Sequence, residues 1–283
     1  MNATGLNDET RDDASGMTAL RAVLWDMDGT LIDSEPYWHQ AEMDIAREHG
    51  GSWSEALGWE CSGKALPVVA SRMIEHGTRL SSERIAQGLI ESVARQEAER
   101  MPWIEGVEDV LRSLAAAGIP SVLVTASPRR MAENLLRQAP EGVFVGYVCG
   151  DDDLPKKPDP APYLAAAKVV GIEVPGDGSR DGVGIGADER SGVGGGKNAA
   201  DDGEHDDVAR RRAFRREMAR CVAIEDSMTG IESAAASGAT TIAQTGFIDI
   251  DTSTGPQFAS VDGYAGLTAA SLERYVTRRL RVR

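Results

Sequence analysis

Arg21-Ala-Val-Leu-Trp-Asp-Met-Asp-Gly-Thr30 is the stretch that decides the fold. Its apolar run is short, ends at Asp26 and lies beside a glycine turn, which predicts a buried strand. Asp26 and Asp28 are two residues apart, so both project to the same side of an extended chain, and Gly29 allows a sharp turn away. Ligands of open parallel sheets bind at the carboxyl ends of strands. This stretch therefore predicts a site, although an acidic turn capped by Asp28 is the structural alternative.

Strand-like and helix-like segments alternate on either side of this stretch. The predicted strands are 120–125, 143–148, 221–225 and 240–244, and the predicted helices between them include 106–117 and 160–170. Ser127 is expected to cap a helix, and so is Ser227, whose helix ends at Gly238. This alternation predicts an α/β fold, a doubly wound parallel sheet with helices on both faces.

Three segments depart from the alternation. Residues 1–19 hold four acids and one arginine without apolar periodicity, which predicts a disordered tail. Residues 35–102 are helix-like throughout, beginning after the expected cap Ser34, and predict a small all-helical cap domain. Residues 176–219 hold 10 of the 31 glycines and predict a low-complexity, disordered insertion that ends in a short basic helix. The predicted core is therefore 20–34 and 103–283, interrupted by this insertion.

Composition excludes several classes of protein. A net charge of −15 argues against binding to nucleic acid or to an anionic membrane, because both need clustered positive charge. The chain has no 18-residue apolar run, and its amino terminus has no signal-peptide pattern. Three cysteines without a CxxC pair predict buried thiols in a reducing compartment. We expect a cytoplasmic protein.

Further polar side chains follow other predicted strands. Glu225 and Asp226 end the strand 221–225, so four carboxylates are expected to meet at one edge of the sheet. Such a group repels itself unless a cation holds it, and oxygen ligands suit Mg²⁺. Thr125 ends the strand 120–125, where a hydroxyl and helix amides make a phosphate cradle. Lys157 lies in the proline-rich loop 155–160; taken alone, it fits a solvated lysine better.

Together these residues resemble the haloacid dehalogenase superfamily of phosphohydrolases, in the subgroup with a helical cap. Four motifs appear in the expected order: Asp26-x-Asp28-Gly-Thr-Leu-Ile-Asp-Ser-Glu, then Thr125, then Lys157-Pro, then Glu225-Asp226-Ser with Gly230. The resemblance covers about 20–175 and 220–270.

The resemblance implies a role for each matched residue. Asp26 is implied as the nucleophile and Asp28 as the general acid and base. A Mg²⁺ ion is implied to be held by the carboxylates of Asp26 and Asp226, by the backbone carbonyl of Asp28 and, directly or through water, by Glu225. The implied phosphate-binding residues are Thr125, Ala126 and Lys157. Lys64, between predicted cap helices, is a candidate to contact the leaving group, although an exposed lysine without a role fits equally well.

The resemblance also implies the activity. The expected reaction is Mg²⁺-dependent hydrolysis of a small phosphate monoester, such as a sugar phosphate or phosphoglycolate, by a monomer. The presence of Asp28 favours phosphoryl chemistry over carbon–halogen cleavage. A β-phosphoglucomutase shares all four motifs and is the alternative activity. That branch usually has a histidine early in its first cap helix. The corresponding position in this sequence is Trp38, and His39 comes one residue later. A binding or regulatory protein that docks through 176–219 is a third hypothesis.

Overall fold

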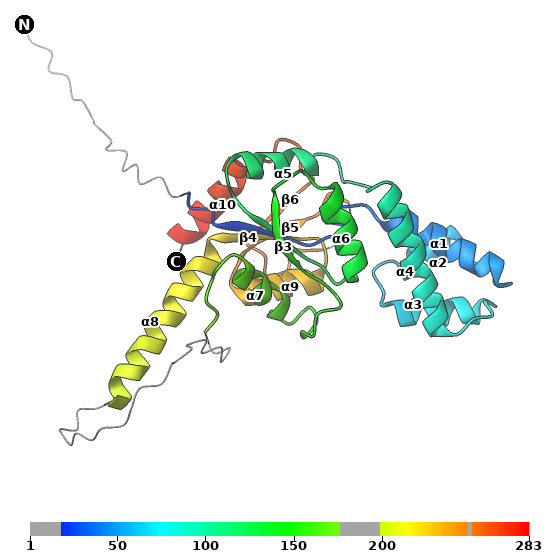
Figure 1. Cartoon of the computed structure of the whole chain (residues 1–283), viewed down its shortest axis with the longest axis horizontal. Coiled ribbons are helices and arrows are strands. Elements are labelled where there is room, and N and C mark those ends of the chain that lie inside the picture. Colours follow the sequence, from blue (N-terminus) through cyan, green and yellow to red (C-terminus); the bar gives the residue numbers. More distant parts are fainter. Residues whose placement is uncertain (1–17, 176–198, 248–250, 283) are drawn as a thin grey trace, which may run out of the picture.

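The fold is one parallel sheet with helices on both faces and a group of helices to one side (Figure 1). The computed structural model describes residues 18–175, 199–247 and 251–282, and the side chains of 199–206 are not described. The described residues form a six-stranded sheet of order β3-β2-β1-β4-β5-β6, in which all neighbours are parallel. The strands are β1 (Ala22–Trp25), β2 (Ser121–Val124), β3 (Phe144–Val148), β4 (Cys221–Glu225), β5 (Thr240–Gln244) and β6 (Ala259–Val261).

Side chains of β1 alternate between two hydrophobic cores. Val23 and Trp25 join one apolar cluster, whereas Ala22 and Leu24 join the other, and all four are completely buried. A strand that is buried on both faces explains why its sequence is a continuous apolar run. The predicted doubly wound sheet is thus confirmed.

Among the described residues, six helices cover the two faces of the sheet. On the face with Trp25 lie α5 (Val107–Ala116), α6 (Arg129–Gln138) and α10 (Ala269–Arg281); on the face with Leu24 lie α7 (Ala161–Val169), α9 (Met228–Ser237) and the end of α8 (Ala199–Ala219). Within the described part of the chain, no helix has both the length and the apolar character that crossing a bilayer requires.

Four consecutive helices lie beside the sheet, between β1 and α5 (Figure 1). They are α1 (Glu35–Glu48), α2 (Glu55–Cys61), α3 (Leu66–Glu75) and α4 (Ser82–Glu99). Two linkers join them to the sheet, and these linkers run side by side: the Asp33 amide donates to the Pro102 carbonyl at 2.9 Å, and the Ile104 amide to the Leu31 carbonyl at 3.0 Å. The helical character predicted for 35–102 agrees with these four elements.

The structure differs from the prediction at the carboxyl end of the predicted insertion 176–219. Residues 199–219 form the long helix α8 rather than a short basic one, and α8 projects from the sheet in Figure 1. Its last turn is packed: Met218 and Ala219 are completely buried, and Phe214 packs on the same cluster. Residues 176–198, and 1–17 of the predicted tail, lie outside the described residues. Sequence analysis also did not predict β6 and α10.

Candidate active site

Acidic side chains lie close together between β1 and β4, where the order of the strands along the sheet changes direction. β1 pairs with both β2 and β4, so β1 and β4 flank the switch point at which doubly wound sheets bind ligands. Asp26 directly follows β1, and its amide donates to the Ile224 carbonyl of β4 at 3.1 Å. Carboxylate oxygens of Asp26, Glu225 and Asp226 all lie within 4.8 Å of one another, and all three residues are buried.

Lys157 bridges two of these carboxylates. Its Nζ donates to Asp26 Oδ1 at 2.6 Å, to Glu225 Oε1 at 2.6 Å and to the Val124 carbonyl at 2.9 Å. Burial alone lowers the pKa of Lys157, but the charges of Asp26 and Glu225 outweigh burial and raise it. The lysine is therefore charged and belongs to the cluster, contrary to the solvated lysine that its loop alone favoured.

The cluster holds more negative charge than Lys157 neutralises. Burial, followed by the charge of Asp26, raises the pKa of Glu225 to about 7 and that of Asp226 well above its ordinary value. The Tyr163 hydroxyl donates to Glu225 Oε1 at 2.5 Å, and the Thr30 hydroxyl donates to Asp226 Oδ1 at 3.0 Å. The three carboxylates converge and offer only oxygen atoms as metal ligands. Such a set of ligands fits Mg²⁺.

Asp28 lies in a different environment from Asp26. Its carboxylate accepts the Ser34 hydroxyl on Oδ1 and the Ser127 hydroxyl on Oδ2, each at 2.6 Å. Burial is the largest effect on the pKa of Asp28 and raises it. The expected meeting of four carboxylates is thus corrected to three, with the Asp28 side chain outside the group.

The two serines also depart from their predicted roles as helix caps. The Ser34 side chain makes no cap hydrogen bond to α1, and α6 begins after Pro128 rather than Ser127. Their hydroxyls bind Asp28 instead. The position of Ser127 just after β2 was the only sequence signal for this role, and nothing in the apolar helix 160–170 indicated that Tyr163 reaches the site.

The turn after β2 holds Thr125 and Ala126 and brings Ser127 to Asp28. The Thr125 amide donates to the Val148 carbonyl at 3.0 Å, and its hydroxyl accepts the Ser127 amide at 2.9 Å. A Cβ on Gly150 would lie 2.1 Å from the Ala126 carbonyl oxygen, so a glycine is required for this close approach. The phosphate-binding roles of Thr125 and Ala126 remain predictions.

Lys64 is not among the residues that the structure places in this cluster. It is exposed and lines a pocket of about 260 Å³ with Glu60, Cys61, Val68, Ser71, Arg72 and Glu75, all from α2, α3 or beside them. Its proposed contact with a leaving group stays a prediction.

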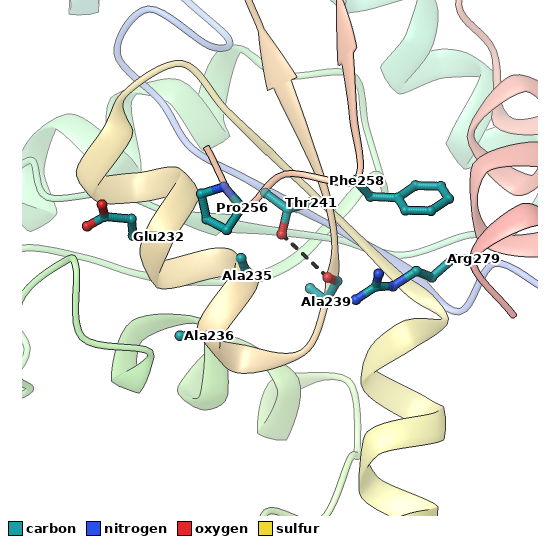
Figure 2. Close-up of a pocket in the computed structure, with 8 residues that line it drawn as sticks. All are labelled: Glu232, Ala235, Ala236, Ala239, Thr241, Pro256, Phe258 and Arg279. Atoms are coloured by element: carbon teal, nitrogen blue, oxygen red, sulfur yellow. Dashed lines mark hydrogen bonds between the residues drawn. The ribbon is translucent and has the colours of Figure 1, made fainter. Parts of the chain in front are cut away.

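A further pocket, of about 390 Å³, lies at the opposite edge of the sheet (Figure 2). Ala239 and Thr241, at the amino end of β5, line it together with Ala235 of α9, Phe258 and Arg279. The strands are parallel, so this pocket is remote from the carboxyl ends at which the acids gather. It is not part of the candidate active site.

Fold and site define a class of protein, and the family comparison agrees. The model of the haloacid dehalogenase-like hydrolases matches residues 20–199, so the chain belongs to this family. The resemblance inferred from the motifs is thereby confirmed, and the chain belongs to a class of hydrolytic enzymes.

Individual relatives carry phosphatase names. The chain is 32% identical over 163 residues to a phosphoglycolate phosphatase of Pseudomonas fluorescens, covering 54% of this chain and 58% of the relative. It is 30% identical over 158 residues to a phosphorylated carbohydrates phosphatase of Thermotoga maritima, covering 54% of this chain and 72% of the relative. The chain thus spans little more than half the length of the phosphoglycolate phosphatase.

Solved structures show the same fold at low identity. A HAD hydrolase of family IA, variant 3, from Entamoeba histolytica is 17% identical with a TM-score of 0.65, covering 91% of this chain and 100% of that chain. A β-phosphoglucomutase from Clostridium difficile is 15% identical with a TM-score of 0.61, covering 93% of this chain and 100% of that chain.

Proposed function

We propose that this protein is a Mg²⁺-dependent phosphohydrolase that cleaves a small phosphate monoester through an aspartyl-phosphate intermediate. The observation that carries the proposal is the environment of Asp26. Its carboxylate lies at the sheet switch point, in contact with the ammonium of Lys157 and within 4.8 Å of the carboxylates of Glu225 and Asp226. The names of the relatives add phosphatase activity as the matching reaction.

Asp26 and Asp28 have different roles in the proposed reaction. Asp26 attacks phosphorus, so an Asp26 oxygen–phosphorus bond forms while the bond to the ester oxygen breaks. Asp28, whose pKa is raised, gives its proton to the departing alkoxide. It then takes a proton from the water that cleaves the acyl phosphate, which releases inorganic phosphate and restores both side chains.

The remaining site residues bind the phosphoryl group or the metal ion. Lys157 attracts the phosphoryl oxygens, assisted by the Thr125 hydroxyl and the backbone at Ala126. Asp26, Asp226, the Asp28 backbone carbonyl and, directly or through water, Glu225 are the proposed ligands of Mg²⁺. When bound, the ion supplies positive charge that lets an anionic nucleophile approach an anionic ester.

The helices of 35–102 are proposed as a cap that selects the substrate, and 20–34 with 103–283 as the core. The proposed substrate is a small phosphorylated metabolite, with a sugar phosphate and phosphoglycolate as the first compounds to test. Lys64 of the cap remains a candidate for the leaving group. All three cysteines are free and buried, which supports a cytoplasmic site of action, and we propose a monomer.

The mutase alternative finds less support in the first cap helix. His39 is buried edge-on against Trp59, with ring centroids 4.6 Å apart, and its Nε2 lies 3.2 Å from Glu35 Oε2. A histidine held inside the cap is a poor candidate for acid–base work on a sugar. Isomerisation of β-glucose 1-phosphate in a coupled assay would restore this alternative.

The proposal is tested by phosphate release from p-nitrophenyl phosphate. Activity is expected with Mg²⁺ and is expected to vanish with EDTA and in Asp26→Asn. Asp109→Asn is the matched control, because Asp109 is an exposed residue of α5. Undiminished turnover in Asp26→Asn would remove Asp26 as the nucleophile.

A further inference from the structure

Tyr163 is a buried tyrosine that connects α7 to the acidic cluster. Its side chain is completely buried, in the apolar cluster that also holds Leu24, Val124 and Ala223. A phenylalanine or an aliphatic side chain would fill such a cluster without a polar group that needs a partner. The Tyr163 hydroxyl has its partner in the site, since it donates to Glu225 Oε1 at 2.5 Å. The tyrosine therefore serves the site as well as the core.

The same carboxylate oxygen also binds Lys157. Lys157 Nζ donates to Glu225 Oε1 at 2.6 Å, and it lies over the Tyr163 ring at 5.5 Å from the ring centroid. An ammonium in this position is attracted by the face of the ring, which is a cation–π contact. Tyr163 thus acts on Lys157 in two ways, directly through its ring and, through Glu225, by its hydroxyl.

The second oxygen of Glu225 is held from the other side. Glu225 Oε2 accepts the Ser227 hydroxyl at 3.4 Å, and it lies so close to α9 that a Cβ on Gly230 would be 1.9 Å away. The carboxylate is therefore held at both oxygens. On the side of Lys157, the hydroxyl of Tyr163 is the group that holds it.

All three N–H donors of the Lys157 ammonium are engaged. They meet Asp26 Oδ1, Glu225 Oε1 and the Val124 carbonyl. A phosphoryl oxygen therefore binds Lys157 only in exchange for one of these acceptors. Asp26 is the acceptor that we expect to be exchanged, because the proposed nucleophile loses its charge when it bonds to phosphorus. Glu225 and the Val124 carbonyl then keep the ammonium in place.

From these contacts we propose that Tyr163 is a positioning residue for phosphoryl binding. Its hydroxyl holds Glu225 Oε1 and its ring supports the ammonium, so that Lys157 exchanges Asp26 for a phosphoryl oxygen without leaving its place. This inference rests on the proposed phosphatase function. It adds to that function a residue that acts only through Glu225 and Lys157.

The test measures phosphate binding, because this is the step in which Lys157 takes part. Tyr163→Phe removes the hydroxyl and keeps the ring. Tyr147→Phe is the matched control: the Tyr147 hydroxyl also donates to a glutamate, Glu133 at 2.9 Å, and the ring also carries a cation, Arg129 at 5.4 Å. The readouts are the Ki of inorganic phosphate as a competitive inhibitor, its Kd by calorimetry with Mg²⁺, and kcat/KM for p-nitrophenyl phosphate and glycerol 3-phosphate.

Tyr163→Phe is expected to raise the Ki and Kd of phosphate about 10-fold and to lower kcat/KM about 10–100-fold, because partners that orient site ligands have effects of this size. The fall in kcat/KM is expected to be the same for both esters, since Lys157 acts on the phosphoryl group that they share. Tyr147→Phe is expected to keep wild-type values. Ki does not depend on how much of the protein is folded, so a purely structural role of Tyr163 would leave it unchanged.

A second comparison asks whether Tyr163 acts through Glu225. In a Glu225→Gln background, Tyr163→Phe is expected to change the Kd of phosphate less than it does in the wild-type background, because the effects of interacting residues are not additive. Calorimetry measures this without turnover. Equal changes in the two backgrounds would contradict a role through Glu225.

The other outcomes separate the role of Tyr163 from the proposed function. An unchanged Ki in Tyr163→Phe, or a fall in kcat/KM for one ester alone, removes the positioning role and leaves phosphatase activity in place. No phosphate release by the wild type from either ester removes the proposed function itself. If Tyr163→Phe does not fold, Tyr163→Met provides the same measurement, because it also lacks the hydroxyl and has a more adaptable side chain.

Discussion

At the scale of single residues, the site depends on two aspartates of one motif in unlike surroundings. Asp26 is bound by the Lys157 ammonium, whereas Asp28 is bound by two hydroxyls and is buried so that its pKa rises. Separated environments of this kind let one carboxylate act as the nucleophile while its neighbour carries a proton.

The first residue-scale prediction concerns Asp28→Asn. The asparagine keeps the shape of Asp28 and an oxygen for one serine, so the variant is expected to fold. It has no proton to give, so kcat for a hydroxylated alkyl ester is expected to fall about 10²–10⁴-fold. The fall is expected to be smaller for p-nitrophenyl phosphate, whose leaving group needs little protonation. Steady-state kinetics on both esters measure this, and an equal fall for both would contradict a role as general acid.

The second residue-scale prediction concerns Gly230. A Cβ there would lie 1.9 Å from Glu225 Oε2, so Gly230→Ala must displace the Glu225 carboxylate. We expect a loss of about 1–3 kcal/mol in unfolding free energy, and weaker Mg²⁺ activation. Thr229→Ala is the control, because Thr229 is the exposed neighbour on α9. Chemical denaturation and a Mg²⁺ titration of activity measure both effects, and wild-type values for Gly230→Ala would refute the packing argument.

At the scale of elements, sequence predicted best what depends on local periodicity. The strands around Leu24, Leu123 and Ile224 are apolar runs bounded by polar residues, and each lies within a residue or two of its prediction. Short β6 has only three residues, too few for a pattern. In α10, the buried residues Ala269, Leu272 and Val276 follow helical spacing, so a usable signal was present there.

Helix α8 gives the element-scale prediction. Met218 is completely buried in its last turn, whereas Val208 is 61% exposed nearer its start. Met218→Ala is expected to cost about 2–5 kcal/mol of unfolding free energy, and Val208→Ala almost nothing. Urea denaturation measures the difference. Equal costs would mean that the end of α8 does not anchor the segment to the sheet.

At the scale of the whole molecule, the sequence predicted where the site lies. It did not predict the individual contacts between the side chains of the site. Parallel topology sends the ends of β1 and β4 to one edge, so the meeting of Asp26 with Glu225 and Asp226 was predictable. The partners of Ser127 and Tyr163 are side chains distant in the chain, Asp28 and Glu225, for which local patterns carry no information.

The most direct test of the account asks whether Asp26 becomes phosphorylated. The wild type is mixed with Mg²⁺ and a turned-over ester, quenched in acid during steady state, and treated with borohydride, which reduces an acyl phosphate but not a free carboxylate. Peptide mass spectrometry then locates the reduced residue. The account predicts reduction at Asp26, dependent on substrate and absent in Asp26→Asn. Reduction at another residue, or active enzyme with no reducible intermediate under any quench time, would contradict it.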